Sequence, residues 1–223
     1  AQTKSAVSYK NPVVDIAMPD PTVIKAADGY FYVYATESTR NVPIMKSKDL
    51  VEWTYCNTAF TNKTRPRFEP KAGIWAPDIN YINGKYVLYY AMSVWGGEQT
   101  CGIGVATANS PQGPFTDHGK MLRSNEIGVQ NSIDPSLLQY EGRNYLVWGS
   151  FRGIYVIELT ADGLSIMSGA KKKRIAGTAF EAVYIHKHDD YYYMFASIGS
   201  CCQGVKSTYT VSYTHLTLRR RLR

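Results

Sequence analysis

The sequence predicts an all-β fold built from a repeated four-stranded unit, and three observations support this prediction. Tyr-rich runs with alternating apolar and polar residues recur along the chain, and each follows a short turn sequence. An acidic residue stands before each of these turns, at intervals of roughly 50 residues. No stretch of useful length has the periodicity of a helix.

The first two repeats contain the strongest turn signals. One reads DPTVIKAADGYFYVYAT from Asp20, and the other reads PDINYINGKYVLYYAMS around Asp78. The Asp-Gly pair at 28–29 and the Asn-Gly pair at 83–84 supply the positive φ that a tight antiparallel turn needs. Each repeat therefore predicts a β-hairpin that begins near an acidic residue.

The next two repeats follow the same plan with weaker turns. They read DPSLLQYEGRNYLVWGS from Asp134 and EAVYIHKHDDYYYMFAS from Glu181. Further strand-like segments lie between the hairpins, with the sequences PIMKSKDLVEW, CGIGVATANSPQGPF and GIYVIELTADGL. Two hairpins make a four-stranded unit, and a unit repeated at this period predicts a β-propeller.

A β-sandwich is the alternative architecture, since it also uses many short strands and turns. A sandwich does not predict one acid at the same point of each repeat. In a propeller the first strand of every blade lines the axis, so residues early in these strands converge at one mouth of the channel. We therefore expect Asp20, Asp78, Asp134 and Glu181 at equivalent positions around a single cavity.

The composition argues against several other classes of protein. The 223 residues are 44% hydrophobic, and no run approaches the roughly 18 apolar residues of a membrane span. The net charge is +7, but four arginines fall in the last five residues, so we expect no nucleic-acid partner. The four cysteines lack metal-ligand spacing. The chain starts at Ala1 without a leader, which suits a secreted or periplasmic protein after signal-peptide removal.

Converging carboxylates indicate a reaction. An Asp before Pro often caps its own turn, which explains Asp20 or Asp134 singly, but several like charges in one cavity are costly without a function. Glycoside hydrolysis uses one carboxylic acid to protonate the leaving oxygen and one carboxylate to activate water or to attack. A third acid nearby raises the pKa of the first. The sequence has no G-x-S-x-G, P-loop or dinucleotide motif that would indicate another chemistry.

These motifs resemble glycoside hydrolase family 43, and within it the endo-1,5-α-L-arabinanases, over roughly residues 10–210. The resemblance is carried by DPTVI, WAPDI, NSIDPSLL, GSF, EAVYI and GSCCQGVKSTY. It implies a five-bladed propeller that cleaves internal α-1,5-L-arabinofuranosidic bonds of arabinan with inversion of configuration. The acids alone also fit an exo-acting β-xylosidase or α-L-arabinofuranosidase, and a non-catalytic carbohydrate-binding propeller stays open as an alternative.

The resemblance implies a role for each acid. Asp20 would be the general base, Glu181 the general acid, and Asp134 the acid that raises the pKa of Glu181 and orients it. For inversion, Asp20 and Glu181 are expected about 6.5 to 9.5 Å apart. Asp78 would then be a structural residue. The implied substrate contacts are Trp75, Gly96, Asn131, Ser132, Ile133, Gly149, Ser150 and Phe151.

The chain departs from the family pattern near residue 209. We expect a propeller domain over 1–209, truncated to about four blades, and a non-native tail over 210–223 with the sequence TVSYTHLTLRRRLR. The chemistry requires no cofactor, and the ligand region of an expected structural calcium ion in the axial channel would lie in the missing blade. The expected partner of the monomeric protein is a polysaccharide of the arabinan or arabinoxylan type. The vicinal pair Cys201-Cys202 is open to a strained disulfide or two thiols.

Overall fold

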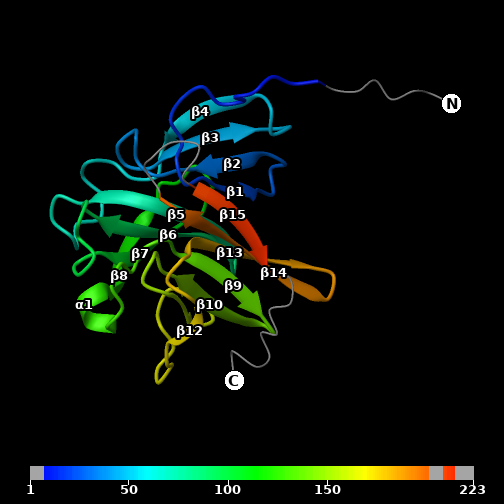
Figure 1. The fold of residues 1–223 in the computed structure, drawn as a ribbon. Helices are drawn as coiled ribbons and strands as arrows, with labels where there is room; N and C mark the ends of the chain where they lie inside the picture. The colour runs from blue at the N-terminus through cyan, green and yellow to red at the C-terminus, as the bar shows by residue number, and fades with distance from the viewer. Residues whose placement is uncertain (1–7, 201–207, 214–223) are drawn as a thin grey trace.

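The computed structural model describes residues 8–200 and the backbone of residues 208–213. Its strands form four antiparallel sheets, and strands that follow one another in the chain are neighbours within each sheet (Figure 1). The predicted all-β fold is confirmed. The first sheet contains β1 (Thr22–Lys25), β2 (Phe31–Tyr34), β3 (Pro43–Ser47) and β4 (Trp53–Thr58).

The other sheets repeat this meander. The second contains β5 (Gly73–Ile82), β6 (Lys85–Ser93), β7 (Gly102–Ala108) and β8 (Thr116–Arg123), which leads into the short helix α1 (Ser124–Ile127). The third contains β9 (Ser136–Tyr140), β10 (Arg143–Trp148), β11 (Ile154–Glu158) and β12 (Lys173–Ala176). The fourth contains β13 (Glu181–His188), β14 (Tyr191–Gly199) and β15 (Thr208–Tyr213).

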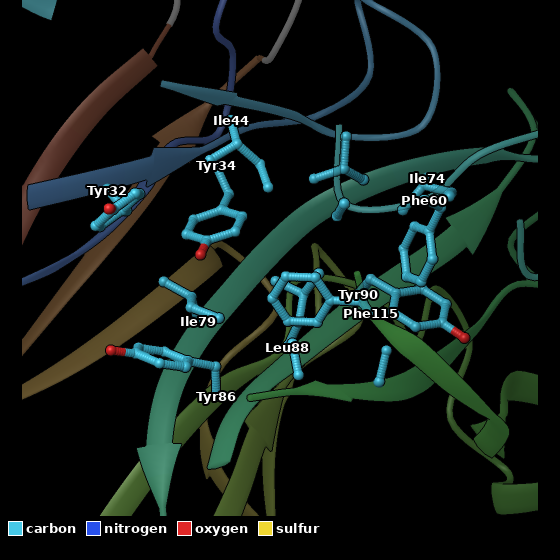
Figure 2. Close-up of a cluster of buried hydrophobic side chains, with 14 of the residues drawn as sticks. Tyr32, Tyr34, Ile44, Phe60, Ile74, Ile79, Tyr86, Leu88, Tyr90 and Phe115 are labelled. Carbon is cyan, nitrogen blue, oxygen red and sulfur yellow. The ribbon is translucent and has the colours of Figure 1, made fainter. Parts of the chain in front are cut away.

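The first strands of the sheets lie next to one another. Strand β1 contacts β5, β5 contacts β9, and β9 contacts β13. Apolar side chains fill the space between successive sheets, because each sheet buries its faces against its neighbours. Figure 2 shows the cluster between the first two sheets, where Tyr34, Ile44, Ile74 and Leu88 are completely buried. Similar clusters join the second sheet to the third and the third to the fourth.

Packing accounts for many of the tyrosines. Tyr34, Tyr89 and Tyr90 are all completely buried. A buried phenol needs a hydrogen-bond partner, and each of these has one. The Tyr89 hydroxyl donates to the Gly163 carbonyl at 2.8 Å. Aromatic rings of this kind therefore belong to the core between the sheets.

The four acids do not occupy equivalent positions relative to the first strands of their sheets. Asp20 (49°), Ala76 (41°), Asp134 (57°) and Ala182 (50°) all have a positive φ, and the first three each stand directly before a proline. Asp78 therefore lies two residues beyond the position of Asp20 and Asp134, and Glu181 lies one residue before it. The expectation of four equivalent acids is wrong, because the prolines at 21, 77 and 135 mark the shared register and the acids do not.

Strand β15 runs from Thr208 to Tyr213 and pairs with β14 along its whole length. It crosses the boundary expected between the domain at 1–209 and the tail at 210–223, and that division stays a prediction. Within the described residues, no helix is long and apolar enough to cross a membrane.

Candidate active site

Three carboxylates meet where the first strands of three sheets begin. Asp20 and Asp134 lie two residues before β1 and β9, and Glu181 is the first residue of β13. The Ala182 amide donates to Asp134 Oδ2 at 3.2 Å, which joins the starts of β9 and β13. The charges of Glu181 and Asp20 both raise the pKa of Asp134, so the three side chains form one electrostatic group.

Two of the three carboxyl groups have a raised pKa. The pKa of Asp134 is raised to about 8, mainly by burial and further by the charges of Glu181 and Asp20. Burial also raises the pKa of Glu181; a hydrogen bond from Ser150 opposes this, and the charge of Asp20 adds to it. The resemblance assigns the effect on Glu181 to Asp134, and that role stays a prediction; the causes found for the raised pKa of Glu181 are burial and the charge of Asp20.

Asp20 is held by a threonine that the sequence reasoning missed. The Thr36 hydroxyl donates to Asp20 Oδ2 at 2.5 Å and accepts from the Ala76 amide at 2.7 Å. The Thr36 amide donates to the Pro19 carbonyl at 2.9 Å, and this hydrogen bond joins the end of the first hairpin to the segment before β1. Asp20 itself is exposed. The only sequence signal for Thr36 is its place at the end of the first repeat.

Glu181 is held by the turn between β10 and β11. The Ser150 hydroxyl donates to Glu181 Oε2 at 3.2 Å, and the same two residues form an isolated antiparallel bridge. The Phe151 amide donates to the Phe180 carbonyl at 2.9 Å. Gly149 precedes them at φ 127°, a conformation that requires glycine. The expected contacts Gly149 and Ser150 are both buried, and Ser150 reaches Glu181 directly.

The segment before Asp134 lies between this turn and the β6–β7 loop. Asn131 donates from Nδ2 to the Ser150 carbonyl at 3.0 Å and from its amide to the Glu98 carbonyl at 2.7 Å. Ser132 is completely buried, and its hydroxyl donates to Val129 and accepts from Trp148. Of the expected contacts here, Asn131 is part-exposed, and Ser132 has no exposed surface for a substrate.

Trp75 and Trp95 form an aromatic pair. Trp75 is half-buried at the position one residue before Ala76, and it packs against Ile133. Its ring centroid lies 5.6 Å from that of Trp95, which is 79% exposed. Gly96 follows at φ 78° with open space around its α-carbon. Trp95 was missed by the sequence reasoning, although its neighbour Gly96 was expected at the substrate.

A salt bridge ties the loops of this face together. The Arg152 guanidinium donates to both Glu98 carboxylate oxygens, at 2.9 and 2.8 Å. Glu98 belongs to the β6–β7 loop that carries Trp95, and Arg152 belongs to the turn that carries Ser150. Such a bidentate pair fixes geometry as well as charge. The second and third sheets are thereby joined at the rim of the site.

The described residues do not fit a metal ion. Among them, no group of three or more His, Cys, Asp or Glu side chains is arranged to hold one. Calcium takes six to eight oxygen ligands. The inner strands contribute the buried carboxylate of Asp78, whose Oδ2 is taken by N–H donors of Asn80 and Leu137. The expected calcium site thus has no ligand set in this part of the chain, and Cys201-Cys202 lies outside the described residues.

Comparisons with known proteins identify the family and the fold. The family model "Glycosyl hydrolases family 43" matches residues 9–220. The extracellular endo-alpha-(1->5)-L-arabinanase 1 of Bacillus subtilis is 36% identical over 207 residues, which cover 87% of this chain and 63% of that protein. The solved native Bacillus subtilis arabinanase superposes with a TM-score of 0.77 and 32% identity, covering 90% of this chain and 72% of that one.

A further solved structure, an exo-1,5-alpha-L-arabinanase from a bovine ruminal metagenomic library, gives a TM-score of 0.75 and 30% identity, covering 93% of this chain and 74% of that one. The chain spans about three fifths of the length of the curated relatives it matches. Since the family model covers nearly all of the sequence, and the shared fold brings three carboxylates together at one face, the chain belongs to glycosyl hydrolase family 43.

Proposed function

We propose that this chain is the larger part of an inverting glycoside hydrolase that cleaves internal α-1,5-L-arabinofuranosidic bonds of arabinan. The observation that carries this proposal is the convergence of Asp20, Asp134 and Glu181 at the starts of three inner strands, with raised pKa values for two of them. Carboxyl groups of unequal proton affinity are what acid–base hydrolysis of a glycosidic bond requires.

In this proposal the protein needs no cofactor. Glu181 gives its proton to the glycosidic oxygen as the bond to the anomeric carbon breaks. Asp20 takes a proton from a water molecule, whose oxygen forms the new bond to that carbon from the opposite face. Burial keeps Glu181 protonated to higher pH, and exposure leaves Asp20 open to solvent. Asp134 would hold the second proton of the group and would raise the pKa of Glu181 once it ionises.

The exposed aromatic pair supports a sugar substrate. A flat apolar surface suits the face of a pentose ring, and Trp95 presents such a surface to solvent. Trp75 supports it from below, at a ring separation of 5.6 Å. Gly96 and Phe151 lie on the flanking loops, and Asn131 offers a part-exposed amide. We propose these residues as the substrate contacts, with Gly149, Ser132 and Ile133 shaping the backbone beneath them.

The fourth sheet supports a five-bladed propeller of which this chain holds four blades. One face of its hairpin packs on the third sheet through Val183, Ile185 and Met194. The opposite face carries six aromatic side chains in three cross-strand pairs, which are Tyr184 with Phe195, His186 with Tyr193, and His188 with Tyr191. Tyr184 is 52% exposed. A fifth sheet would bury this face, as each earlier sheet buries that of its neighbour.

Secretion is proposed because the Bacillus subtilis relative is named as extracellular. A pectic polysaccharide is too large to enter a cell, so an enzyme that cuts it internally acts outside. The substrate class and the compartment are therefore consistent with each other.

Release of reducing ends from linear arabinan tests the proposal. The samples are this chain and a chimera in which the C-terminal part of the Bacillus subtilis relative follows residue 209. Each is assayed with Glu181→Gln and with the control Glu126→Gln, a part-exposed carboxylate on α1. We expect the chimera to cut, Glu181→Gln to abolish cutting, and Glu126→Gln to leave it unchanged. A chimera that releases nothing, or that survives Glu181→Gln, would refute the proposal.

The exo-acting relative provides the second candidate mode of action. Early products distinguish the two modes, because an endo-acting enzyme releases long oligosaccharides first and an exo-acting enzyme releases one short product throughout. Long early products support the proposed endo mode, and a single short product would replace it with the exo mode.

A further inference from the structure

Asp78 is a buried carboxylate that the proposed chemistry does not use. It lies in β5, the first strand of the second sheet, and is 8% exposed. Its pKa is raised to about 6, because burial raises it more than the hydrogen bonds with Asn80, Leu137 and Thr22 lower it. A buried carboxylate is an unfavourable choice for stability alone.

The hydrogen bonds of Asp78 join the two strands that carry Asp20 and Asp134. The Leu137 amide, in β9, donates to Asp78 Oδ2 at 2.8 Å. Thr22, at the start of β1, accepts at Oγ1 from the amide of Ile79, the residue after Asp78, at 3.3 Å, and its hydroxyl is near enough to Asp78 to lower the pKa of that carboxyl. Leu137 is three residues beyond Asp134, and Thr22 is two residues beyond Asp20.

Asn80 completes the arrangement from within β5. Its Nδ2 donates to the same Asp78 Oδ2 at 2.7 Å. A charged oxygen accepts two such donors strongly, whereas a neutral amide oxygen accepts them weakly and its NH₂ group repels a donor. An uncharged side chain at 78 would thus loosen the link between β1, β5 and β9.

We propose that Asp78 is a positioning residue, whose carboxylate sets the spacing of β1 and β9 and so holds Asp20 and Asp134 in one group. This inference rests on the proposed function for its kinetic consequence, although the spacing itself can be measured without activity. Two non-glycine residues at positive φ, Asp20 and Asp134, sit at the ends of the linked strands. Their side-chain directions depend on where those strands begin.

The test is Asp78→Asn, with Asp117→Asn as the matched control. Asp117 lies in β8, and its hydrogen-bond partners are the Gly119 amide, at 2.9 Å, and the Tyr90 hydroxyl in β6, neither of which belongs to β1 or β9. We expect Asp78→Asn in the chimera to lower kcat on arabinan by about a hundredfold with little change in KM, the scale of an ångström misplacement. Asp117→Asn should leave kcat unchanged.

A carbon-13 NMR titration of the side-chain carboxyls of this chain gives the readout that needs no activity. If Asp78 sets the spacing, Asp78→Asn should lower the pKa of Asp134, because its carboxylate neighbours move away. The charge of Asp78 is not among the causes of the Asp134 shift, so its loss alone should not do this. An unchanged Asp134 titration in a folded Asp78→Asn variant would overturn the inference, whatever the enzyme assay shows.

Thr22→Val and Thr22→Ser cover the case in which Asp78→Asn fails to fold. Valine keeps the shape of Thr22 but removes the hydroxyl, and should shift the Asp134 titration in the same direction by less. Serine keeps the hydroxyl and should restore it. If valine and serine behave alike, the link through Thr22 is absent and the inference fails. A wild-type chimera without activity would refute the proposed function only, because the titration of Asp134 still tests the positioning role of Asp78.

Discussion

Gly149→Ala should destabilise the chain far more than a comparable change at another turn glycine. Gly149 has a φ of 127°, outside the region near φ +60° that other residues visit, and this costs about 1 to 3 kcal/mol. A β-carbon there would lie 2.2 Å from the Gly153 carbonyl oxygen, so backbone must move. Overpacking of this kind costs about 1 to 3 kcal/mol, and the two effects together give about 2 to 6 kcal/mol.

Gly142→Ala is the matched control, because it lies in the same sheet at φ 73° with nothing within 4 Å of the added carbon. It should lose only about 1 kcal/mol. Urea unfolding of the two variants, followed by tryptophan fluorescence, gives the free energies. Equal losses for the two variants would refute the argument that the turn before Ser150 is fixed by close backbone contact.

Three further predictions follow from the site. As pH rises from about 4 to about 7, Asp78→Asn should gain up to about 3 kcal/mol of stability relative to wild type, because a raised carboxyl pKa means that ionisation of Asp78 destabilises the folded state. Urea unfolding at pH 4.5 and at pH 7 measures this difference, and a difference that does not change with pH contradicts the prediction. Ser150→Ala should raise the pKa of Glu181 and move the high-pH limb of the rate profile of the chimera upward, and a downward shift would show that Ser150 does not stabilise the carboxylate. Trp95→Ala should weaken the binding of arabino-oligosaccharides about tenfold, or about 1.4 kcal/mol, without changing the melting temperature. Calorimetry measures this against the control Tyr55→Ala, on the outer strand β4, and equal affinity in the two variants argues against a sugar platform at Trp95.

The hairpins and the core were accessible from sequence because their causes are local. The Asn-Gly pair at 83–84 adopts the positive φ values of a tight turn, 49° and 80°, and β5 pairs with β6 directly across it. Alternation in the Tyr-rich runs identified strands, since side chains in a strand point to opposite faces by turns. The four-stranded repeat followed from these signals.

The register of the acids was not accessible in the same way. Asp78 was expected beside Asp20 and Asp134 because all three begin similar motifs, yet it lies two residues deeper in its strand. Aligning the motifs on their shared proline gives the correct register, whereas aligning them on the acidic residue does not. Glu181, which has no proline after it, was placed within one residue by the hairpin that follows.

The sequence by itself determined that this protein is an all-β repeat with acids near the start of its inner strands, because strand alternation, turn chemistry and residue order are properties of neighbouring residues. Only the tertiary structure decided that burial raises the pKa of Asp134, that Thr36 and Ser150 hold Asp20 and Glu181, and that Asp78 contacts a neighbouring inner strand. Each of these facts depends on burial or on contacts between residues of different sheets. Pairs such as Asp78 and Leu137 are distant in the chain, and only the packing of the inner strands brings them within hydrogen-bonding distance.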